Sequence, residues 1–172
     1  MIIGQPGSGK SSLARVLGER VGLPVHHVDK IHWKSGWVER DRDEKLHLIS
    51  KVEAESHWII EGGLSKTWEN RVSRADTLIW LDVPLAIRAW RVLKRRIVYH
   101  GRSRPDLPKG CPEKIHLDFA VWIWSTRNSA RAEMEALFNT APPPKSRFCL
   151  KTGTQVKQFV STLAENAGST DP

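Results

Sequence analysis

Cysteine is scarce in this sequence of 172 residues, and the two cysteines, Cys111 and Cys149, lie far apart without a CxxC pair. We therefore expect neither a disulfide framework nor a four-cysteine zinc site. The sequence lacks a run of about eighteen apolar residues, so we expect no membrane-spanning helix. It also reaches glycine and lysine too early for a signal peptide. These absences, with the lack of internal repeats, favour one cytoplasmic domain.

Acidic residues are also in deficit, with 19 Asp and Glu against 27 Lys and Arg, and the formal net charge is +8. The excess is local rather than diffuse. Between Val83 and Gly110, eight basic residues stand against Asp106 alone, which leaves a local charge of +7. The eight are Arg88, Arg91, Lys94, Arg95, Arg96, Arg102, Arg104 and Lys109. A basic patch of this kind predicts an anionic partner.

Short apolar segments alternate with amphipathic segments along the chain. The apolar segments, which are typical of strands, span 1–3, 24–28, 57–60, 77–81 and 146–150. The helical patterns span 11–20, 41–56, 65–73, 84–100, 113–139 and 154–166, and the stretch 30–40 has an irregular pattern. This alternation predicts parallel strands joined by right-handed crossovers, and so an α/β sheet covered by helices on both faces. We expect a single domain over residues 1–167, with a lid loop around 101–113 and a disordered tail at 168–172.

The carboxyl ends of the predicted strands carry the residues of chemical interest. Ligands of open parallel sheets bind at this edge, and Gly4, Asp29, the Glu61-Gly62-Gly63 corner and Asp82 are all expected there. The first strand, at residues 1–3, is short for a central strand, and we expect that a few residues precede it.

The first strand end is followed by Gly4-Gln5-Pro6-Gly7-Ser8-Gly9-Lys10-Ser11, which matches the pattern G-x-x-x-x-G-K-[ST]. Glycines let such a loop wrap a phosphate, and the following helix N-terminus adds N–H donors and a positive dipole. The lysine can reach the β and γ phosphates, and the last serine hydroxyl can coordinate Mg²⁺. The pattern predicts ATP and Mg²⁺ as cofactors, bound by Gly7, Ser8, Gly9, Lys10, Ser11 and Ser12. The alternative is a glycine-rich turn without a ligand.

Two acidic residues at strand ends are candidates for metal or proton chemistry. Asp82 ends the apolar run TLIWLD, where an acid can support the Mg²⁺ shell; alternatively it caps the helix after Pro84. Asp29 can hold Mg²⁺ or accept a proton from an acceptor hydroxyl; alternatively it is an ordinary turn residue.

Arginines of the basic segment are spaced by three and four residues at Arg88, Arg91 and Arg95. This spacing predicts one helical stripe, with Trp90, Leu93 and Ile97 facing the core on the other side. Guanidinium groups suit a transferring phosphoryl group, although a solvated basic face has the same pattern. A closing lid could bring Arg102 and Arg104 to the site. On the predicted long helix, Arg127 and Arg131 could line the far side of the site.

Tryptophan is abundant, with eight residues. Trp33 and Trp37 follow Asp29, where they could stack on a planar or sugar-like substrate or pack the loop against the body. The tryptophans in regular elements are expected in the core or in grooves: Trp58, Trp80, Trp90, Trp122 and Trp124. Exposed tryptophans beside a basic patch also suit single-stranded nucleic acid.

Several stretches together resemble the adenylate-kinase-like P-loop kinases, over almost the whole chain. They are GQPGSGKSSLARVLGERVGLPVHHVDKIHW, WIIEGG, ADTLIWLDVP, RVLKRR, GRSRPDL and GCPE. The stretches HVDKIHW and GRSRPDL…GCPE are more specific, and resemble the bacterial group labelled DNA topology modulation protein or FlaR. Where related enzymes have Asp-Gly-Asn, this chain has Glu61-Gly62-Gly63. Its lid has one cysteine rather than four, and the nucleotide-monophosphate motif of adenylate kinases is absent.

The resemblance implies a three-layer P-loop fold with a five-stranded parallel sheet in the order 2-3-1-4-5 and an arginine-rich lid. It implies that ATP phosphates bind at residues 7–12 and adenine between the lid and the loop 152–155. The acceptor would lie between the Asp29 loop and the Glu61-Gly62-Gly63 corner, and the lid arginines would be Arg95, Arg96, Arg102 and Arg104.

Two functions follow from these patterns. The favoured one is a phosphotransferase that moves the γ-phosphoryl group of Mg·ATP to a nucleotide- or metabolite-like acceptor. Its predicted catalytic residues are Lys10, Asp29, Arg95, Arg102 and Arg104, its acceptor residues are Trp33, Trp37, Glu61, Gly62 and Gly63, and its metal ligands are Ser11 and Asp82. The alternative is an ATP-binding regulator associated with nucleic acid, and an ATPase without an acceptor is a third. No membrane partner is expected, and the protein would be a monomer or a homodimer.

Overall fold

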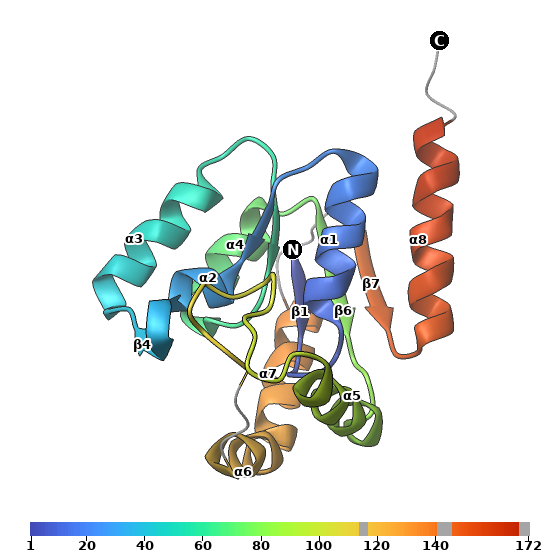
Figure 1. Ribbon diagram of the computed structural model, residues 1–172. Helices are drawn as coiled ribbons and strands as arrows, with labels where there is room; N and C mark the ends of the chain where they lie inside the picture. The colour runs from blue at the N-terminus through green and yellow to red at the C-terminus, as the bar shows by residue number, and fades with distance from the viewer. Residues whose placement is uncertain (114–116, 141–145, 169–172) are drawn as a thin grey trace.

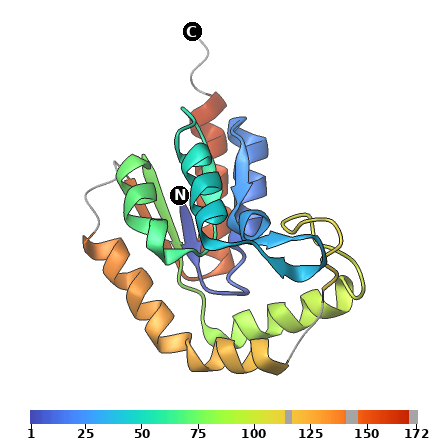
Figure 2. The ribbon, with the colours of Figure 1, turned by 90° about the vertical axis from the view of Figure 1, so that its left-hand side faces the viewer.

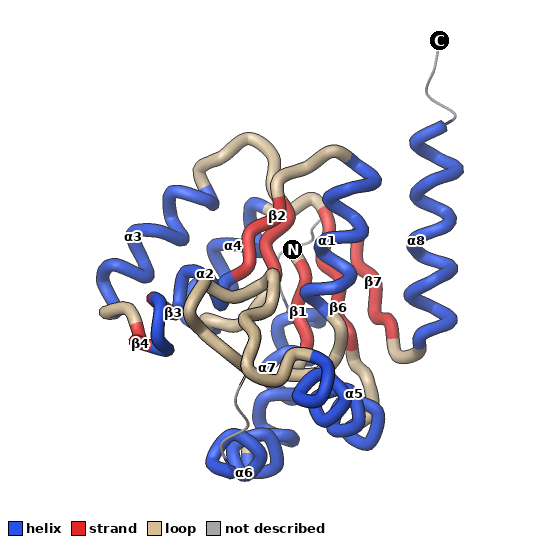
Figure 3. The backbone as a smooth tube through the Cα atoms, in the orientation of Figure 1, coloured by secondary structure: helices blue, strands red, loops and turns tan. Residues whose placement is uncertain are grey.

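The computed structural model describes residues 1–113, 117–140 and 146–168. The main sheet is parallel and has the strand order β2-β5-β1-β6-β7 (Figures 1 and 3). Its strands are β1 (Ile2–Gly4), β2 (Val25–His27), β5 (Ile59–Glu61), β6 (Thr77–Leu81) and β7 (Ser146–Leu150). Numbered along the chain within this sheet, the order is 2-3-1-4-5, which confirms the expected α/β class and topology.

Helices cover both faces of the sheet because successive strand residues point to opposite sides. On β6, Ile79 and Leu81 pack against one helix layer, formed by α1 (Lys10–Val21) and α8 (Gly153–Gly168). Leu78 and Trp80 pack in the cluster formed with α4 (Trp68–Arg74) and α7 (Arg127–Thr140). The third helix on that face, α3 (Arg42–Glu53), contributes Ile49 to a smaller cluster. Figure 2 shows this three-layer arrangement from the side.

The segment after β2 is more regular than its sequence indicates. Residues 28–40 form the short helix α2 (Val28–His32) and a two-stranded antiparallel hairpin of β3 (Trp33–Lys34) and β4 (Val38–Glu39), joined by η1 (Ser35–Trp37). The prediction that Asp29 ends a strand was wrong, because it lies in the first turn of α2. After β5, the short η2 (Ser65–Thr67) leads into α4.

Two further helices lie at the carboxyl edge of the sheet, α5 (Leu85–Val98) and α6 (Leu117–Ser125) (Figures 1 and 2). The predicted long helix over 113–139 is instead two helices, α6 and α7, which are separated at Thr126. Within the described part of the chain, no helix is both long and apolar enough to cross a bilayer. Of the predicted tail, residues 169–172 lie outside the described residues.

The orientation of α5 is the reverse of the predicted one. Trp90, Leu93 and Ile97 are exposed by 62%, 48% and 70%, whereas Arg88 is buried. Arg88 is drawn inward because its guanidinium donates to the carbonyls of Val83 and Pro6. The expectation that tryptophans in regular elements pack in the core or in grooves holds for Trp58 and Trp80, which pack in the core, and for Trp122, which lines a cavity. It fails for Trp90 and for Trp124 of α6, which are exposed.

Candidate functional site

The loop between β1 and α1 has a backbone that depends on its glycines. Gly7 and Gly9 have φ angles of 79° and 98°, in the left-handed region that favours glycine. A Cβ on Gly7 would lie 2.5 Å from the carbonyl oxygen of Arg88, so the loop and α5 touch through their backbones. Gly9 caps α1, and the first N–H groups of a helix have no partner within it. The segment therefore has the shape of a phosphate-binding loop.

Arginines of α5 hold this loop from outside. Arg88 Nη1 donates to the Pro6 carbonyl at 3.4 Å, and Arg91 Nη1 donates to the Ser8 carbonyl at 2.8 Å. In a trans peptide the N–H points opposite to the C=O, so the N–H groups of Gly7 and Gly9 point away from these arginines. Burial lowers the pKa of Arg88, and Asp82 partly offsets this. Arg88 therefore supports the loop rather than an incoming ligand.

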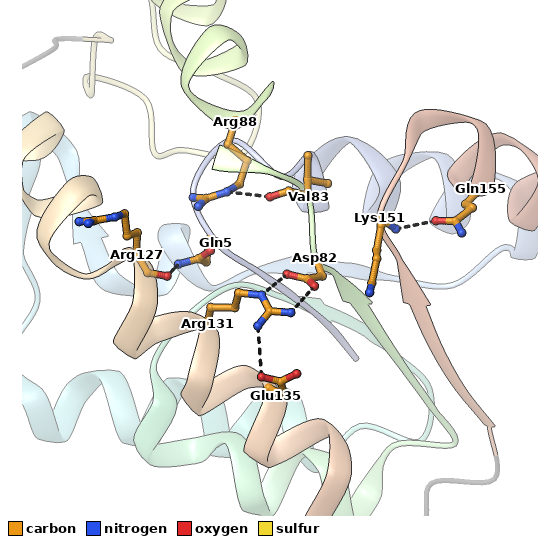
Figure 4. A network of polar contacts seen from close by, with 9 residues as sticks. All are labelled: Gln5, Asp82, Val83, Arg88, Arg127, Arg131, Glu135, Lys151 and Gln155. Carbon is orange, nitrogen blue, oxygen red and sulfur yellow. Dashed lines mark hydrogen bonds and ion pairs between the residues drawn. The ribbon is translucent and has the colours of Figure 1, made fainter. Parts of the chain in front are cut away.

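The loop also has unused hydrogen-bonding capacity. Ser8 is 2% exposed, and its hydroxyl has no hydrogen-bond partner within the described part of the chain. On the other side of the loop, Gln5 Nε2 donates to the Arg127 carbonyl at 2.8 Å (Figure 4). The loop is thus anchored on both flanks, while its interior retains donors for an anion.

A cavity of about 1500 Å³ opens in front of the loop. Ligand pockets commonly occupy about 300–1000 Å³, so this one has room for a nucleotide and a second molecule. Residues distant in sequence line it together: Lys10, Ser11, Ser12, Asp29, Trp33, Trp37, Gly63, Arg91, Arg95 and Arg104. The structure therefore brings most of the predicted site residues into one space.

Asp29 lines this cavity and interacts electrostatically with the loop lysine, Lys10. Burial raises the pKa of Asp29, the charge of Lys10 opposes this, and Glu61 raises it further. No hydrogen bond to its side chain is present among the described residues. A carboxylate with a raised pKa and no partner is suited to accept a proton.

The corner after β5 is stabilised by buried side chains that do not line the cavity. Glu61 is 1% exposed, makes a 2.6 Å hydrogen bond with His27 Nδ1, and does not line the cavity. The fully buried Arg71 donates to the carbonyls of Gly62, Gly63 and Leu64, and burial lowers its pKa to about 10. Glu61 and Gly62 therefore position the corner, whereas Gly63 and Leu64 reach the cavity.

The two loop tryptophans line the cavity and also hold neighbouring segments. Their rings meet edge to face, with centroids 5.4 Å apart. Trp37 Nε1 donates to the Pro112 carbonyl at 2.9 Å, and Gly36 N donates to the Gly110 carbonyl at 3.0 Å. The two alternatives for these residues are thus compatible, because the hairpin packs against the predicted lid segment, residues 101–113, while its two tryptophans line the cavity.

Only two of the four predicted lid arginines line the cavity. Arg95 and Arg104 line it, but Arg102 is exposed and lies outside the cavity wall. Arg95 and Arg104 are both ion-paired with Glu113, which the residue patterns did not single out. The available signal was the GCPE stretch that contributes to the family resemblance.

Asp82 has a different partner from the predicted one. Both of its carboxylate oxygens accept from Arg131, at 2.9 Å from Nε and 2.8 Å from Nη2 (Figure 4). Asp82 lines a separate cavity of about 400 Å³ with Arg127 and Arg131. Arg127 and Arg131 do not line the main cavity, and the metal role of Asp82 with Ser11 stays a prediction.

Comparison with solved structures shows likeness at low sequence identity. An uncharacterized protein from Eubacterium ventriosum shares 15% identity and a TM-score of 0.51, over 98% of this chain and 97% of that one. Deoxyadenosine kinase from M. mycoides shares 14% identity and a TM-score of 0.49, over 96% and 100%. Shikimate kinase from Aquifex aeolicus shares 18% identity and a TM-score of 0.46, over 98% and 99%. The first supports the fold alone.

Sequence comparison identifies the family. A search of curated proteins found no match to this sequence. The family described as AAA domain (AAA_18) matches residues 1–100, which is more than half of the chain and includes the phosphate-binding loop, Asp29 and all of α5. The P-loop follows the central strand of a five-stranded parallel sheet at its carboxyl edge, and this chain belongs to the AAA domain family AAA_18.

Proposed function

We propose that this protein is an ATP-dependent phosphotransferase that moves the γ-phosphoryl group of Mg·ATP to a small-molecule acceptor. The observation that carries the proposal is the convergence of three features on one cavity. These are the P-loop with Lys10, the unpartnered carboxylate of Asp29, and the guanidinium groups of Arg95 and Arg104.

The P-loop side of the cavity suits the nucleotide. Residues 7–12 would bind the phosphates through backbone N–H groups, and Lys10 would contact the β and γ phosphates. Gly153 and Val156 line the same cavity, which supports adenine binding between the lid and the loop 152–155. No group of three or more His, Cys, Asp or Glu suited to a metal occurs among the described residues. Mg²⁺ would accordingly take ligands from the phosphates and the Ser11 hydroxyl.

The opposite side suits the acceptor and the transferring group. When bound, Mg²⁺ neutralises charge on the phosphates. Asp29 would orient an acceptor hydroxyl and take its proton, for which its raised pKa is suited. Trp33, Trp37 and Gly63 would contact the acceptor. Arg95 and Arg104 would stabilise charge on the phosphoryl group as it passes from ATP to the acceptor, and we propose that residues 101–113 act as the lid over this step.

The alternative function, a regulator that binds nucleic acid, depends on the basic segment from Val83 to Gly110. Several arginines of that segment face inward, where Arg88 and Arg91 bind loop carbonyls and Arg95 and Arg104 line the cavity. They do not form one outer basic face, and this favours the phosphotransferase. Binding of single-stranded DNA that falls steeply with salt would favour the alternative.

The experiment that tests the proposal is release of ADP from Mg·ATP by the purified protein, with and without a panel of nucleosides, nucleotides and hydroxylated metabolites. We expect one acceptor class to stimulate release, and Lys10→Ala to abolish it. Lys66→Ala is the control, because Lys66 is an exposed lysine away from the cavity. Unchanged turnover in Lys10→Ala, or no stimulation by any acceptor while DNA binds, would overturn the proposal.

A further inference from the structure

The lid segment buries two carboxylates that have no role in the scheme above. Asp106 and Glu113 are each 4% exposed, beside the buried apolar residues Leu107 and Cys111. Burying a carboxylate is costly unless it is paired with cations and hydrogen-bonded. Buried acids in a segment otherwise rich in arginine therefore need an account of what they pair with.

Glu113 connects the lid to α5. Its Oε1 accepts from Arg95 Nε of α5 at 3.0 Å, and its Oε2 forms an ion pair with Arg104 Nε of the lid at 2.8 Å. Its backbone is also held, because its carbonyl accepts from Arg96 Nη1 at 2.5 Å and its N–H donates to the Arg102 carbonyl at 2.9 Å. One buried carboxylate thus fixes two guanidinium groups from different segments.

These contacts leave donors available on both arginines. Arg95 donates through Nε to Glu113, and Arg104 donates through Nη1 to Asp106 at 2.5 Å. Arg104 Nε lies 2.8 Å from Glu113 Oε2 in an ion pair that lacks hydrogen-bond geometry. Within the described part of the chain, Arg95 Nη1 and Nη2 and Arg104 Nη2 make no hydrogen bond, and both side chains line the main cavity. Guanidinium forks fixed along one edge present the other edge in a defined direction, which suits phosphate oxygens.

The two arginines would repel each other without this carboxylate. Burial lowers the pKa of Arg95, the charge of Arg104 lowers it further, and the charge of Glu113 opposes both. An anionic ligand could replace part of that compensation, but the arginines would then have to be brought together as the ligand binds. Holding them in place beforehand removes that ordering step.

We propose that Glu113 is a positioning residue that sets the guanidinium groups of Arg95 and Arg104 to contact the γ-phosphoryl group, with Asp106 assisting at Arg104. This inference rests on the proposed function. Glutamine at position 113 would keep one oxygen acceptor but would turn an NH₂ donor toward the other arginine. Glu113→Gln should therefore release one guanidinium at nearly constant side-chain volume.

The first measurement requires no nucleotide. In protein labelled with ¹⁵N-arginine, we expect slow hydrogen exchange at the Nε–H of Arg95 and at the Nη1–H group of Arg104, which donate to Glu113 and Asp106. Glu113→Gln should speed exchange at Arg95 by about tenfold or more, as expected when a buried charge-assisted hydrogen bond opens. Asp106→Asn should affect Arg104 alone. Glu135→Gln is the matched control, because Glu135 pairs with Arg131 on α7 outside the main cavity.

The second measurement is calorimetric binding of Mg·ADP and of the non-hydrolysable analogue Mg·AMPPNP. Glu113→Gln should weaken AMPPNP by about tenfold and ADP by less than about twofold, because the lost contacts are to the γ-phosphoryl group. In protein that also carries Arg95→Gln and Arg104→Gln, Glu113→Gln should have no further effect. A purely structural role would lower the melting temperature without separating the two nucleotides.

The outcomes separate the two proposals. If Lys10→Ala weakens both nucleotides but Glu113→Gln changes neither the exchange rates nor the ratio of affinities, the phosphotransferase stands and the positioning role is wrong. If the wild-type protein binds neither nucleotide, both proposals fail. If Glu113→Gln does not fold, Asp106→Asn decides, with unchanged Arg104 exchange and unchanged AMPPNP affinity overturning the inference.

Discussion

The P-loop and the lid segment, residues 101–113, both line the same cavity but are built in opposite ways. In the P-loop the donors for an anion are backbone N–H groups, and the loop conformation follows from adjacent glycines and the start of α1. In the lid segment the donors are arginine side chains, and Arg104 is held by the buried carboxylates of Asp106 and Glu113. The first arrangement is local in sequence, whereas the second also requires Arg95 of α5. Substitutions should therefore damage the two regions through different physical effects.

The largest effect is expected in the P-loop. Gly7→Ala would place a Cβ 2.5 Å from the Arg88 carbonyl at a φ of 79°. Left-handed strain and overpacking together should lower the free energy of unfolding by about 3 kcal/mol and abolish nucleotide binding. Gly22→Ala is the control, because Gly22 has a φ of 66° but nothing within 4 Å; it should cost only about 1 kcal/mol. Urea unfolding and calorimetry measure both, and equal losses would contradict the steric explanation.

The next effect tests whether the P-loop site extends to β6. Asp82→Asn removes a bidentate pair with the partly exposed Arg131 and should cost about 1 kcal/mol of stability. It should leave the Mg²⁺ concentration needed for half-maximal nucleotide binding unchanged, because Asp82 lies in the separate cavity. Thermal unfolding and a Mg²⁺ titration measure the two quantities. A large rise in the Mg²⁺ requirement would instead support the metal role expected from the sequence.

A smaller effect is expected where the hairpin holds the lid. Trp37→Phe removes the hydrogen bond to the Pro112 carbonyl and should ease lid opening by about 1 kcal/mol. Proteolysis within residues 101–113 should then be about five times faster. Trp33→Phe is the control, since no hydrogen bond of the Trp33 indole is present among the described residues. Equal proteolysis of the two variants would show that the indole bond does not restrain the lid.

The smallest effect concerns Asp29, which lies between the two regions. Its pKa is raised above the ordinary value of 3.8, so its ionisation destabilises the folded state. The wild-type stability contribution is therefore full below pH 3.8 and is lost as pH rises through the raised pKa. Asp29→Asn should be more stable than the wild type at pH 7, and the difference should vanish at low pH. Urea unfolding between pH 3 and pH 8 measures it, and a difference independent of pH would contradict the assignment.

Much of the fold could be predicted because its signals are local. The alternation of apolar strands and amphipathic helices led to the parallel sheet, and the five predicted strand positions correspond to β1, β2, β5, β6 and β7. The P-loop was identified from consecutive residues, since its glycines and helix start are neighbours in the chain. Asp29, Trp33 and Trp37 were placed correctly at the cavity because a short element follows β2 directly.

The errors concern contacts between distant segments. An amphipathic pattern shows that α5 has two unlike faces but not which one is buried. The buried one carries Arg88, because the Pro6 and Val83 carbonyls need donors at that position. Similarly, the pairing of Asp82 with Arg131 could not be predicted, because the two residues are 49 positions apart in the sequence.

The sequence by itself determined the sheet class and the phosphate-binding loop, since backbone conformation and helix capping depend on neighbouring residues. Only the tertiary structure decided which charged side chains form ion pairs. It paired Arg131 with Asp82 and brought Arg95 to Glu113, because a buried charge is stable only where the fold supplies its partner.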